Sequence, residues 1–284
     1  MTLPPLPAIE PEGAIGVITG FIRSQLEQTG FERLVVGLSG GVDSATVAYL
    51  AALAVGADNL LAVRMPYRSS ASASETDALR VVTALGCRTE LVEITPMVDP
   101  MLSLIDGSDE ATLVRRGNVM ARQRMIVLYD RSASFDALVA GTSNKTEALL
   151  GYGTLHGDMA AAIAPIGDLY KSQLRAVATA LGVPSEILDK PPSADLWEGQ
   201  TDEGELGASY DDLDRILFAL VDRRWTVQRC VAAGLDAALV AWVAQRVARY
   251  EFKRQLPPVA KVSLRTPGID HLYPRRRPGS RRGS

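Results

Sequence analysis

A hydrophobic run that breaks into a glycine-containing turn is the feature that most constrains how this chain folds. The run Leu34–Leu38 is followed by residues 39–44, Ser-Gly-Gly-Val-Asp-Ser, and then by small residues that favour a helix. This order predicts a buried strand, a tight turn and a helix whose first N–H groups face one anion. Two adjacent glycines let the main chain approach that anion closely, and two serine hydroxyls add donors. The sequence therefore predicts a phosphate-binding turn at residues 39–44.

Residue 43 distinguishes this turn from the phosphate-binding loop of kinases and GTPases. That loop ends in Gly-Lys-Ser/Thr, and no lysine follows Gly40 and Gly41. Asp43 disfavours bare phosphate but is a good ligand for phosphate-bound Mg²⁺. An ordinary glycine turn is the alternative, but the whole hexapeptide and its flanks resemble the PP-loop of the ATP pyrophosphatases. Those enzymes cleave ATP between its α- and β-phosphates.

The bulk composition is that of a soluble globular protein. Of 284 residues, 47% are hydrophobic and 22% are charged. No apolar run reaches the ~20 residues of a membrane span, and the first residues lack the parts of a signal peptide. Cys87 and Cys230 have no metal-type spacing and are expected to be free buried thiols, while two histidines, His156 and His271, are too few for a histidine-rich metal site. We predict a cytoplasmic protein with no membrane partner.

Charge is unevenly distributed along the chain. The net charge is −3, but residues 274–284 carry five arginines and no acid, so the remainder carries −8. Interspersed Pro, Gly and Ser predict a basic, disordered tail at 261–284, with binding to nucleic acid or an anionic surface as the alternative. A body this acidic argues against nucleic acid as the main partner.

Short apolar runs alternate with helical patterns along the first two thirds of the chain. Strands are expected at 34–38, 60–64, 90–94 and 138–140, and helices within 1–30, from 44, at 75–85, at 113–135 and at 168–181. The alternation predicts an α/β fold with a doubly wound parallel sheet. Ligands of such sheets bind at the carboxyl ends of the strands, so residues 39–44 and 141–147 are expected at one edge.

The last third of the chain is predicted to be helical after a loop. Lys190–Gly207 is polar and contains prolines, which indicates a mobile loop. Helices are expected at 210–220, 226–233 and 235–251. We predict an N-terminal segment and helix at 1–30, a main domain at 31–260 with extra C-terminal helices, and the tail at 261–284.

Three further segments carry polar residues at defined spacing. Gly141–Glu147 (GTSNKTE) brings hydroxyls and a carboxylate into one turn, and Pro165–Lys171 (PIGDLYK) is expected to place a lysine one turn into a helix. Lys190–Trp197 (KPPSADLW) leads into residues 199–207 (GQTDEGELG). Together with residues 39–44, these segments resemble the ammonia-dependent NAD synthetases of the PP-loop ATP pyrophosphatase superfamily. The resemblance covers about residues 30–260, and four segments in this order are highly specific.

The resemblance implies a two-step reaction with ATP, deamido-NAD and ammonia as substrates. The nicotinate carboxylate of deamido-NAD attacks the α-phosphate of ATP, which gives an acyl-adenylate and pyrophosphate. Ammonia then displaces AMP and forms the amide of NAD. Mg²⁺, a lysine and oriented N–H donors stabilise the charge on the transferring phosphorus, so adenylation needs no acid–base dyad or protein nucleophile.

The resemblance also implies roles for individual residues. Asp43, Glu147 and Lys171 match the catalytic residues, and the two carboxylates match the Mg²⁺ ligands. Contacts with deamido-NAD are implied for Arg122 and Lys253, and less directly for Asp158. ATP contacts are implied for Gly37, Leu38, Ser39, Gly40, Gly41, Val42, Asp43, Ser44, Thr142, Lys171 and Ser193. Without the resemblance, Asp43 is a turn residue, Glu147 a solvated helix residue and Lys171 a surface lysine.

Three positions depart from the family pattern. Leu155 and Ala162 stand where many members carry a Lys and an Asp that contact the dinucleotide, and Phe252 replaces a histidine of some relatives. Either this subfamily binds the dinucleotide through other side chains or its substrate preference is altered. The nucleotide half of the site is thus better supported than the dinucleotide half.

The nitrogen source and the assembly follow from the same resemblance. Glutamine-using NAD synthetases carry a large N-terminal amidase domain, and only about 30 residues precede the first strand here. Free ammonia, or ammonia from a separate partner, is the expected donor, and a homodimer with a shared dinucleotide site is expected. Two alternatives stay open: another PP-loop adenylating ligase with a different acceptor, and a non-catalytic ATP-binding relative.

Overall fold

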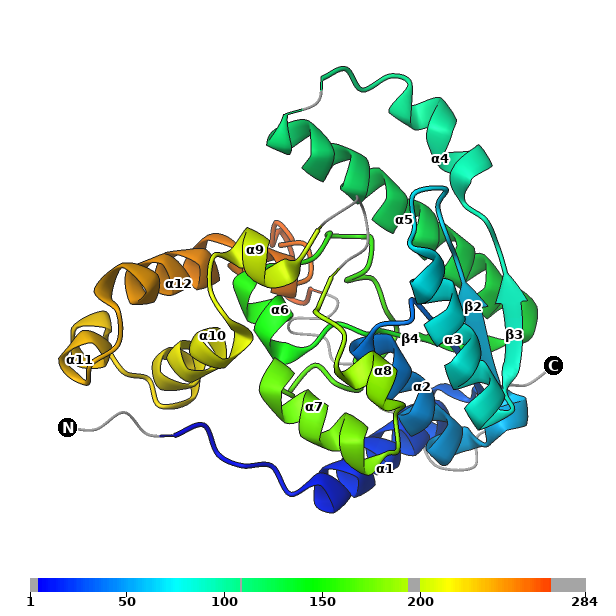
Figure 1. Cartoon of the computed structure of the whole chain (residues 1–284), viewed down its shortest axis with the longest axis horizontal. Helices are drawn as coiled ribbons and strands as arrows, with labels where there is room; N and C mark the ends of the chain where they lie inside the picture. Colours follow the sequence, from blue (N-terminus) through cyan, green and yellow to red (C-terminus); the bar gives the residue numbers. More distant parts are fainter. Residues whose placement is uncertain (1–4, 108, 194–199, 267–284) are drawn as a thin grey trace.

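A four-stranded parallel sheet forms the centre of the molecule (Figure 1). The computed structural model describes residues 5–107, 109–193 and 200–266. The strands lie in the order β3-β2-β1-β4, with bounds β1 Arg33–Gly37, β2 Leu60–Arg64, β3 Arg88–Leu91 and β4 Ala137–Ala140. The chain adds β2 and β3 on one side of β1 and then β4 on the other. The carboxyl ends of β1 and β4 therefore flank a change in winding direction, where α/β sheets bind ligands.

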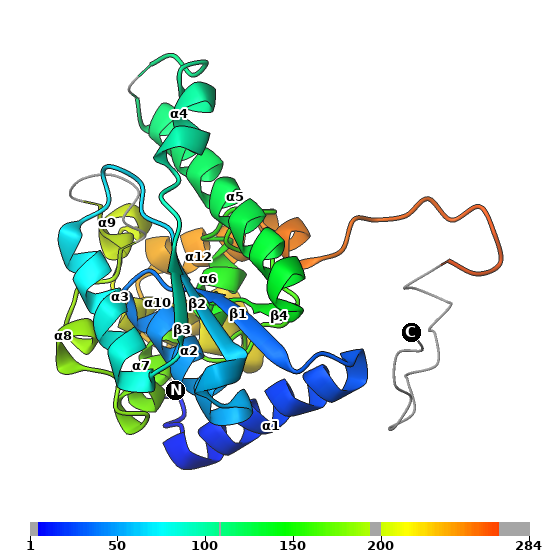
Figure 2. The same cartoon turned by 90° about the vertical axis from the view of Figure 1, so that its right-hand side faces the viewer.

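Helices cover both faces of the sheet, which confirms the predicted doubly wound fold (Figure 2). Successive side chains of a strand point to opposite faces. Leu34 and Val36 accordingly pack in one apolar cluster, whereas Val35 packs in another. The first cluster includes α1 Pro11–Thr29, α2 Val42–Val55, α3 Ser72–Leu85 and α7 Lys171–Ala180, and the second includes α4 Thr95–Leu102 and α5 Glu110–Phe135.

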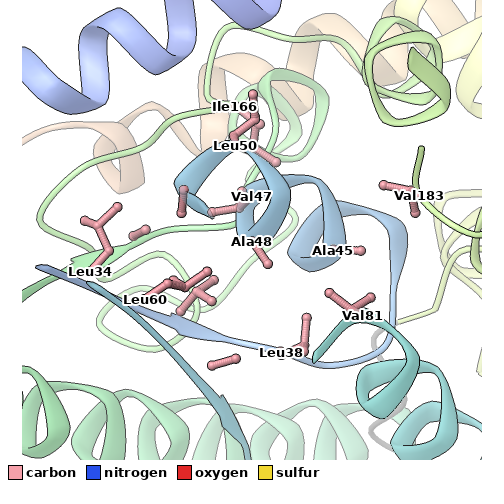
Figure 3. Packing of buried hydrophobic residues seen from close by; sticks show 14 of the residues in the cluster. Leu34, Leu38, Ala45, Val47, Ala48, Leu50, Leu60, Val81, Ile166 and Val183 are labelled. Atoms are coloured by element: carbon pink, nitrogen blue, oxygen red, sulfur yellow. The ribbon is translucent and has the colours of Figure 1, made fainter. Parts of the chain in front are cut away.

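Small apolar side chains allow α2 to pack closely against the sheet. Ala45, Val47, Ala48 and Leu50 are fully buried, and Figure 3 shows them beside side chains of the strands. The helix is apolar on all sides because strands cover one side of it and α1, α3 and α7 cover others. The turn at 39–44 thus leads directly into a helix that the core holds firmly.

The chain after β4 builds a further apolar cluster beside the sheet. Leu150, Leu213 and Val240 are fully buried in it. Figure 1 shows α10, α11 and α12 on the side of the molecule away from β3. The elements of this part are α6 Lys145–Leu150, α9 Asp202–Leu206, α10 Tyr210–Leu217, the π-helix η2 Phe218–Asp222, α11 Val227–Ala232, α12 Ala237–Arg249 and the 3₁₀ helix η3 Glu251–Arg254. The short helix α8 Ser185–Leu188 instead packs in the first cluster, through Ile187.

Several predicted boundaries were wrong. The third strand begins at Arg88 and ends at Leu91. Beyond it, the N–H of Val92 donates to Arg64 at the end of β2, and the N–H of Ile94 donates to Pro66 after β2. The helix expected from 168 begins at Lys171, because tight turns occupy residues 164–169. Lys171 is therefore the first residue of α7 and does not lie one turn inside it.

The predicted loop Lys190–Gly207 contains a helix. Thr201 caps α9 by accepting the N–H of Gly204, and Leu206 is buried, so one helical turn forms within a polar sequence. Residues 194–199 of this predicted loop lie outside the described residues. The same holds for residues 267–284 of the predicted tail. No helix in the described part of the chain is both long enough and apolar enough to cross a membrane.

Candidate active site

The turn at residues 39–44 presents polar groups to an open edge of the sheet. The two hydroxyl oxygens of Ser39 and Ser44 lie 3.0 Å apart, and the N–H of Ser39 donates to Ser44 Oγ at 3.2 Å. The N–H of Gly41 is directed at Ser39 Oγ at 3.3 Å. Gly40 has a φ of +80°, and a Cβ there would lie 2.2 Å from the carbonyl oxygen of Ser74. Only glycine fits this position, so the turn and α3 are packed against each other.

Three charged side chains meet at the carboxyl ends of β1 and β4. The Lys171 ammonium forms an ion pair with the Asp43 carboxylate, and its Nζ lies 3.4 Å from Glu147 Oε1. Asn144 Nδ2 donates to Asp43 Oδ1 at 2.8 Å. Asn144 and Glu147 also cap the start of α6 reciprocally, each side chain accepting the other residue's N–H. We call these four residues the Lys171 cluster, and it joins segments that the sequence predicts to share one edge.

The Lys171 cluster holds two carboxylates against one ammonium. Burial alone lowers the pKa of Lys171, but the charges of Asp43 and Glu147 outweigh it and raise that pKa. Burial, together with the Asp43 charge, raises the pKa of Glu147 to about 8. The side chains of Asp43 and Glu147 retain 18% and 16% of their exposure, whereas Lys171 retains 4%. The two carboxylates are therefore the accessible groups, and a further cation would be favoured beside them.

Two predicted cations lie around the glycine-rich segment at 151–158. Arg122 Nε and Nη2 both donate to the carbonyl oxygen of Leu155 at 3.3 Å. Lys253 Nζ donates to the carbonyl oxygens of Gly151 and Gly153 at 2.8 and 2.6 Å. We call Arg122, Lys253 and Asp158 the glycine-loop cluster.

The third member of the glycine-loop cluster braces the segment itself. Asp158 Oδ1 accepts the N–H of Thr154 at 2.7 Å, while the residue remains exposed. The charge of Asp158 acts to raise the pKa of Lys253, although burial and neighbouring arginines lower it overall. These residues come from α5, the segment after α6 and η3, so the structure brings together side chains more than 100 residues apart.

The comparison with known proteins agrees with this arrangement. The family model for NAD synthase matches residues 14–257. The chain belongs to the NAD synthase family. It is 50% identical over 259 residues to the NH₃-dependent NAD⁺ synthetase of Chlorobium phaeovibrioides, and this match covers 91% of the chain and 92% of the relative.

Two solved structures are similar to this NAD synthase family member. The NMN synthetase of Francisella tularensis matches with a TM-score of 0.78 and 31% identity, over 89% of this chain and 99% of that one. The NH₃-dependent NAD synthetase of Campylobacter jejuni matches with a TM-score of 0.75 and 33% identity, over 89% and 100%. The two neighbours are named for different products, a mononucleotide and a dinucleotide.

The remaining predicted residues are less tightly bound into either cluster. Thr142 is half-buried directly after β4, and Ser193 is exposed at the last described position before residue 200. Ala162 continues the sheet edge, since its N–H donates to the carbonyl oxygen of Val139. Phe252 is 58% exposed in η3, next to Lys253. Arg124, two residues after Arg122 on α5, donates to the carbonyl oxygen of Met65.

Sequence reasoning missed three side chains beside the Lys171 cluster of this NAD synthase family member. Lys171 Nζ lies 5.2 Å from the centroid of the Tyr210 ring. The Tyr210 and Tyr152 hydroxyls donate to the two oxygens of the buried Asp202 at 3.0 and 3.1 Å. Asp202 lies in the polar segment 199–207, so composition pointed to the segment, but only the packing of α9 on α10 identifies the residue.

The donor set of the Lys171 cluster fits Mg²⁺. Asp43 and Glu147 offer carboxylate oxygens, which Mg²⁺ prefers, and the ion usually binds one or two carboxylates together with substrate phosphates and water. Among residues 5–107, 109–193 and 200–266, no group of three or more metal-ligating side chains could hold an ion by itself. This pattern suits an ion that arrives with a nucleotide.

Proposed function

We propose that this chain converts deamido-NAD to NAD with ATP and ammonia, releasing AMP and pyrophosphate. The observation that carries the proposal is the meeting of Asp43, Glu147 and Lys171 beside the turn at 39–44. Over 259 aligned residues the chain is 50% identical to the NH₃-dependent NAD⁺ synthetase of Chlorobium phaeovibrioides. Cation, carboxylates and N–H donors at one sheet edge are what an adenylation step requires.

In the first step, a nicotinate oxygen forms a bond to the α-phosphorus of ATP, and the bond from that phosphorus to pyrophosphate breaks. Ser39, Gly41 and Ser44 would hold the departing pyrophosphate, and the Lys171 ammonium would stabilise charge that develops on the α-phosphate of the transferring adenylyl group. In the second step, ammonia attacks the carbonyl carbon, AMP leaves with the electron pair of the C–O bond, and a proton is lost from nitrogen.

Asp43 and Glu147 would hold Mg²⁺ together with the phosphates. When bound, the ion neutralises phosphate charge and helps to align the α- and β-phosphates. The excess of carboxylate over ammonium in the Lys171 cluster supports this role.

The glycine-loop cluster would bind the acceptor. Arg122 and Lys253 are long cations suited to carboxylate or phosphate, and both donate only to main-chain carbonyls in the contacts described above. Leu155 contributes its carbonyl oxygen and not a charged side chain, so an acceptor would be held by these two cations. We place Asp158 at the nicotinate or ammonia end of this pocket.

We also propose a cytoplasmic homodimer in which the acceptor site lies at the boundary between subunits. Exposed apolar side chains on α4 and α5 support a subunit interface on these helices. Met101, Ile126 and Tyr129 are 49%, 53% and 41% exposed, and a second subunit would cover them. Sedimentation of the full chain tests the assembly, and a monomer with full turnover would contradict it.

The decisive experiment measures AMP and pyrophosphate release from ATP and Mg²⁺ with deamido-NAD, with and without ammonium. Ammonium-dependent formation of NAD supports the proposal, and glutamine in place of ammonium should give no turnover. Release of pyrophosphate without any acceptor preference, or no release despite ATP binding, would contradict it.

The mononucleotide acid is the acceptor to test beside deamido-NAD. The structural neighbour from Francisella tularensis is named an NMN synthetase, which is the product expected from amidation of that acid. We expect the dinucleotide to have the higher kcat/KM. A higher kcat/KM for the mononucleotide acid would mean that the chain catalyses the same amidation with a different acceptor.

A further inference from the structure

In helix α7 the Gln173 side chain accepts the N–H of the N-cap residue at 3.2 Å, but the N–H groups of Lys171 and Ser172 are accepted by side chains of other helices. The N-cap residue of α7 is Tyr170, whose side chain makes no capping hydrogen bond, whereas helix starts usually use Ser, Thr, Asp or Asn. Unpaired N–H groups in the first turn of a buried helix are costly. The first residue of α7 is Lys171, so whatever satisfies these groups also fixes the main chain of Lys171.

The missing cap comes from two other helices. The N–H of Lys171 donates to Thr146 Oγ1 on α6 at 3.0 Å. The N–H and hydroxyl of Ser172 donate to Asp214 Oδ2 on α10 at 2.9 and 2.7 Å. The Thr146 hydroxyl in turn donates to Asp214 Oδ1. Thr146 and Asp214 are both fully buried, so this relay is sealed from water.

Both ends of Lys171 are therefore held by the same two helices. On α6, Thr146 binds the main chain of Lys171, while the next residue, Glu147, faces its ammonium. On α10, Asp214 caps α7, while Tyr210, one turn earlier on the same face, lies under the ammonium. A shift of α7 relative to α6 would move the ammonium away from Asp43 and Glu147 together.

Asp214 differs from an ordinary N-cap residue, because it caps α7 from another helix. Its carboxylate is fully buried, and no Lys or Arg of the described residues forms a salt bridge with it. Three donated hydrogen bonds, from Thr146 and Ser172, replace a counter-ion, and the helix N-terminus adds favourable charge. A neutral cap would satisfy the same N–H groups, but a carboxylate binds them more strongly and fixes the start of α7 more rigidly.

We propose that Thr146 and Asp214 are positioning residues that set Lys171 for adenylyl transfer. This inference rests on the proposed function for its catalytic consequence, and on the hydrogen-bond relay for its structural one. The relay aligns the three charged groups before ATP binds. It acts through Lys171, and neither Thr146 nor Asp214 touches substrate.

The test compares T146V with T146S in the full chain. Valine has the shape of threonine without the hydroxyl, and serine keeps the hydroxyl. T19V is the matched control, because Thr19 is also a buried threonine, but its hydroxyl donates to the carbonyl oxygen of Ile15 within α1. All variants are assayed for kcat and the KM for ATP in pyrophosphate release, and for the unfolding midpoint.

We expect T146V to lower kcat about 100-fold with little change in the KM for ATP, since small misplacement of a positioned group has effects of this size. T146S should restore most of the rate, and T19V should lose stability without losing kcat. A T146V enzyme with unchanged kcat and a midpoint shifted like that of T19V would overturn the proposal.

Hydrogen exchange separates this inference from the proposed function. The Lys171 amide should exchange faster in T146V than in the wild type and T146S, whether or not the chain makes NAD. If the wild type shows no turnover, the proposed function fails while this measurement still decides the relay. If T146V does not fold, S172A is assayed instead, where a several-fold loss of kcat supports the relay and an unchanged kcat overturns it.

Discussion

The Lys171 cluster and the glycine-loop cluster use positive charge in opposite ways. In the first, the ammonium of Lys171 pairs with carboxylates of the same chain. In the second, the side chains of Arg122 and Lys253 donate to main-chain carbonyls. Charge pairs fix geometry before any ligand arrives, whereas carbonyl oxygens are weaker partners that a carboxylate or phosphate can replace. In the proposed function, the first region carries the chemistry and the second binds the acceptor.

Replacing the ammonium of the first region should have the largest effect. We expect K171M to lower the rate of adenylation about 10³-fold, since it removes a preorganised charge from the transferring phosphate. The control is R175M, which removes a cation one turn later on α7. The Arg175 guanidinium donates to the carbonyl oxygen of Leu188. Pyrophosphate release measures both. Comparable losses in the two variants would show that the rate depends on the total positive charge of α7 and not on the position of the Lys171 ammonium.

The close approach at Gly40 should give the next largest effect. G40A places a Cβ 2.2 Å from the Ser74 carbonyl, so the turn or α3 must move, and we expect binding of ATP to weaken about 100-fold. G56A is matched, because Gly56 has a similar φ of +83° and open space around it. That variant should lose about 1–3 kcal/mol of unfolding free energy, because the φ and ψ of Gly56, +83° and 155°, form a conformation that favours glycine. Titration with ATP and thermal unfolding measure these effects, and equal ATP affinity in both would contradict a fixed turn.

A smaller, selective effect is expected in the second region. K253M should raise the KM for deamido-NAD about 10-fold, the value of one charged hydrogen bond, and leave the KM for ATP unchanged. R254M is the control, since the neighbouring Arg254 also donates to carbonyl oxygens, those of Ala148, Leu149 and Val247. A rise in the KM for ATP would mean that the two regions are not separate.

The smallest effect separates the two lysines by their protonation. Burial lowers the pKa of Lys253, whereas the charges of Asp43 and Glu147 outweigh burial and raise that of Lys171. A lower pKa leaves more neutral amine at a given pH, so an amine-acylating reagent at alkaline pH should label Lys253 several-fold faster than Lys171. Peptide mass spectrometry measures the labelling. Faster labelling of Lys171 would overturn the contrast on which the two-region interpretation depends.

The sequence predicts the nucleotide edge far better than its surroundings. Residues 39–44 and 141–147 each follow a buried apolar run, so strand topology alone brings Asp43 and Glu147 together. The start of α7 at Lys171 was missed because the helical pattern was extended back to Asp168, although Pro165 and Gly167 are turn-forming residues and tight turns occupy 164–169. Asp202 and Asp214 depend on how α9 and α10 pack. A faint signal exists for Asp214, a carboxylate on the otherwise apolar face of α10 between Leu213 and Leu217.

The glycine-loop cluster was predicted only through the resemblance. Arg122 and Lys253 lie 131 positions apart in the sequence, and nothing in their local patterns connects them. Their meeting depends on how η3 packs on the segment after α6, which is a property of the whole fold. The role of these cations stays a prediction until the acceptor has been tested.

The position of α10 in the chain has a consequence for how the protein is made. Every residue proposed to touch ATP precedes residue 194, yet the cap on α7 comes from Asp214 and the face under the Lys171 ammonium from Tyr210. During synthesis the sheet and its nucleotide edge leave the ribosome before that helix. Lys171 then lacks its final support until the late helices dock, so the nascent chain passes through a stage that has its phosphate turn but no competent site. The proposed activity thereby depends on the synthesis and docking of α10.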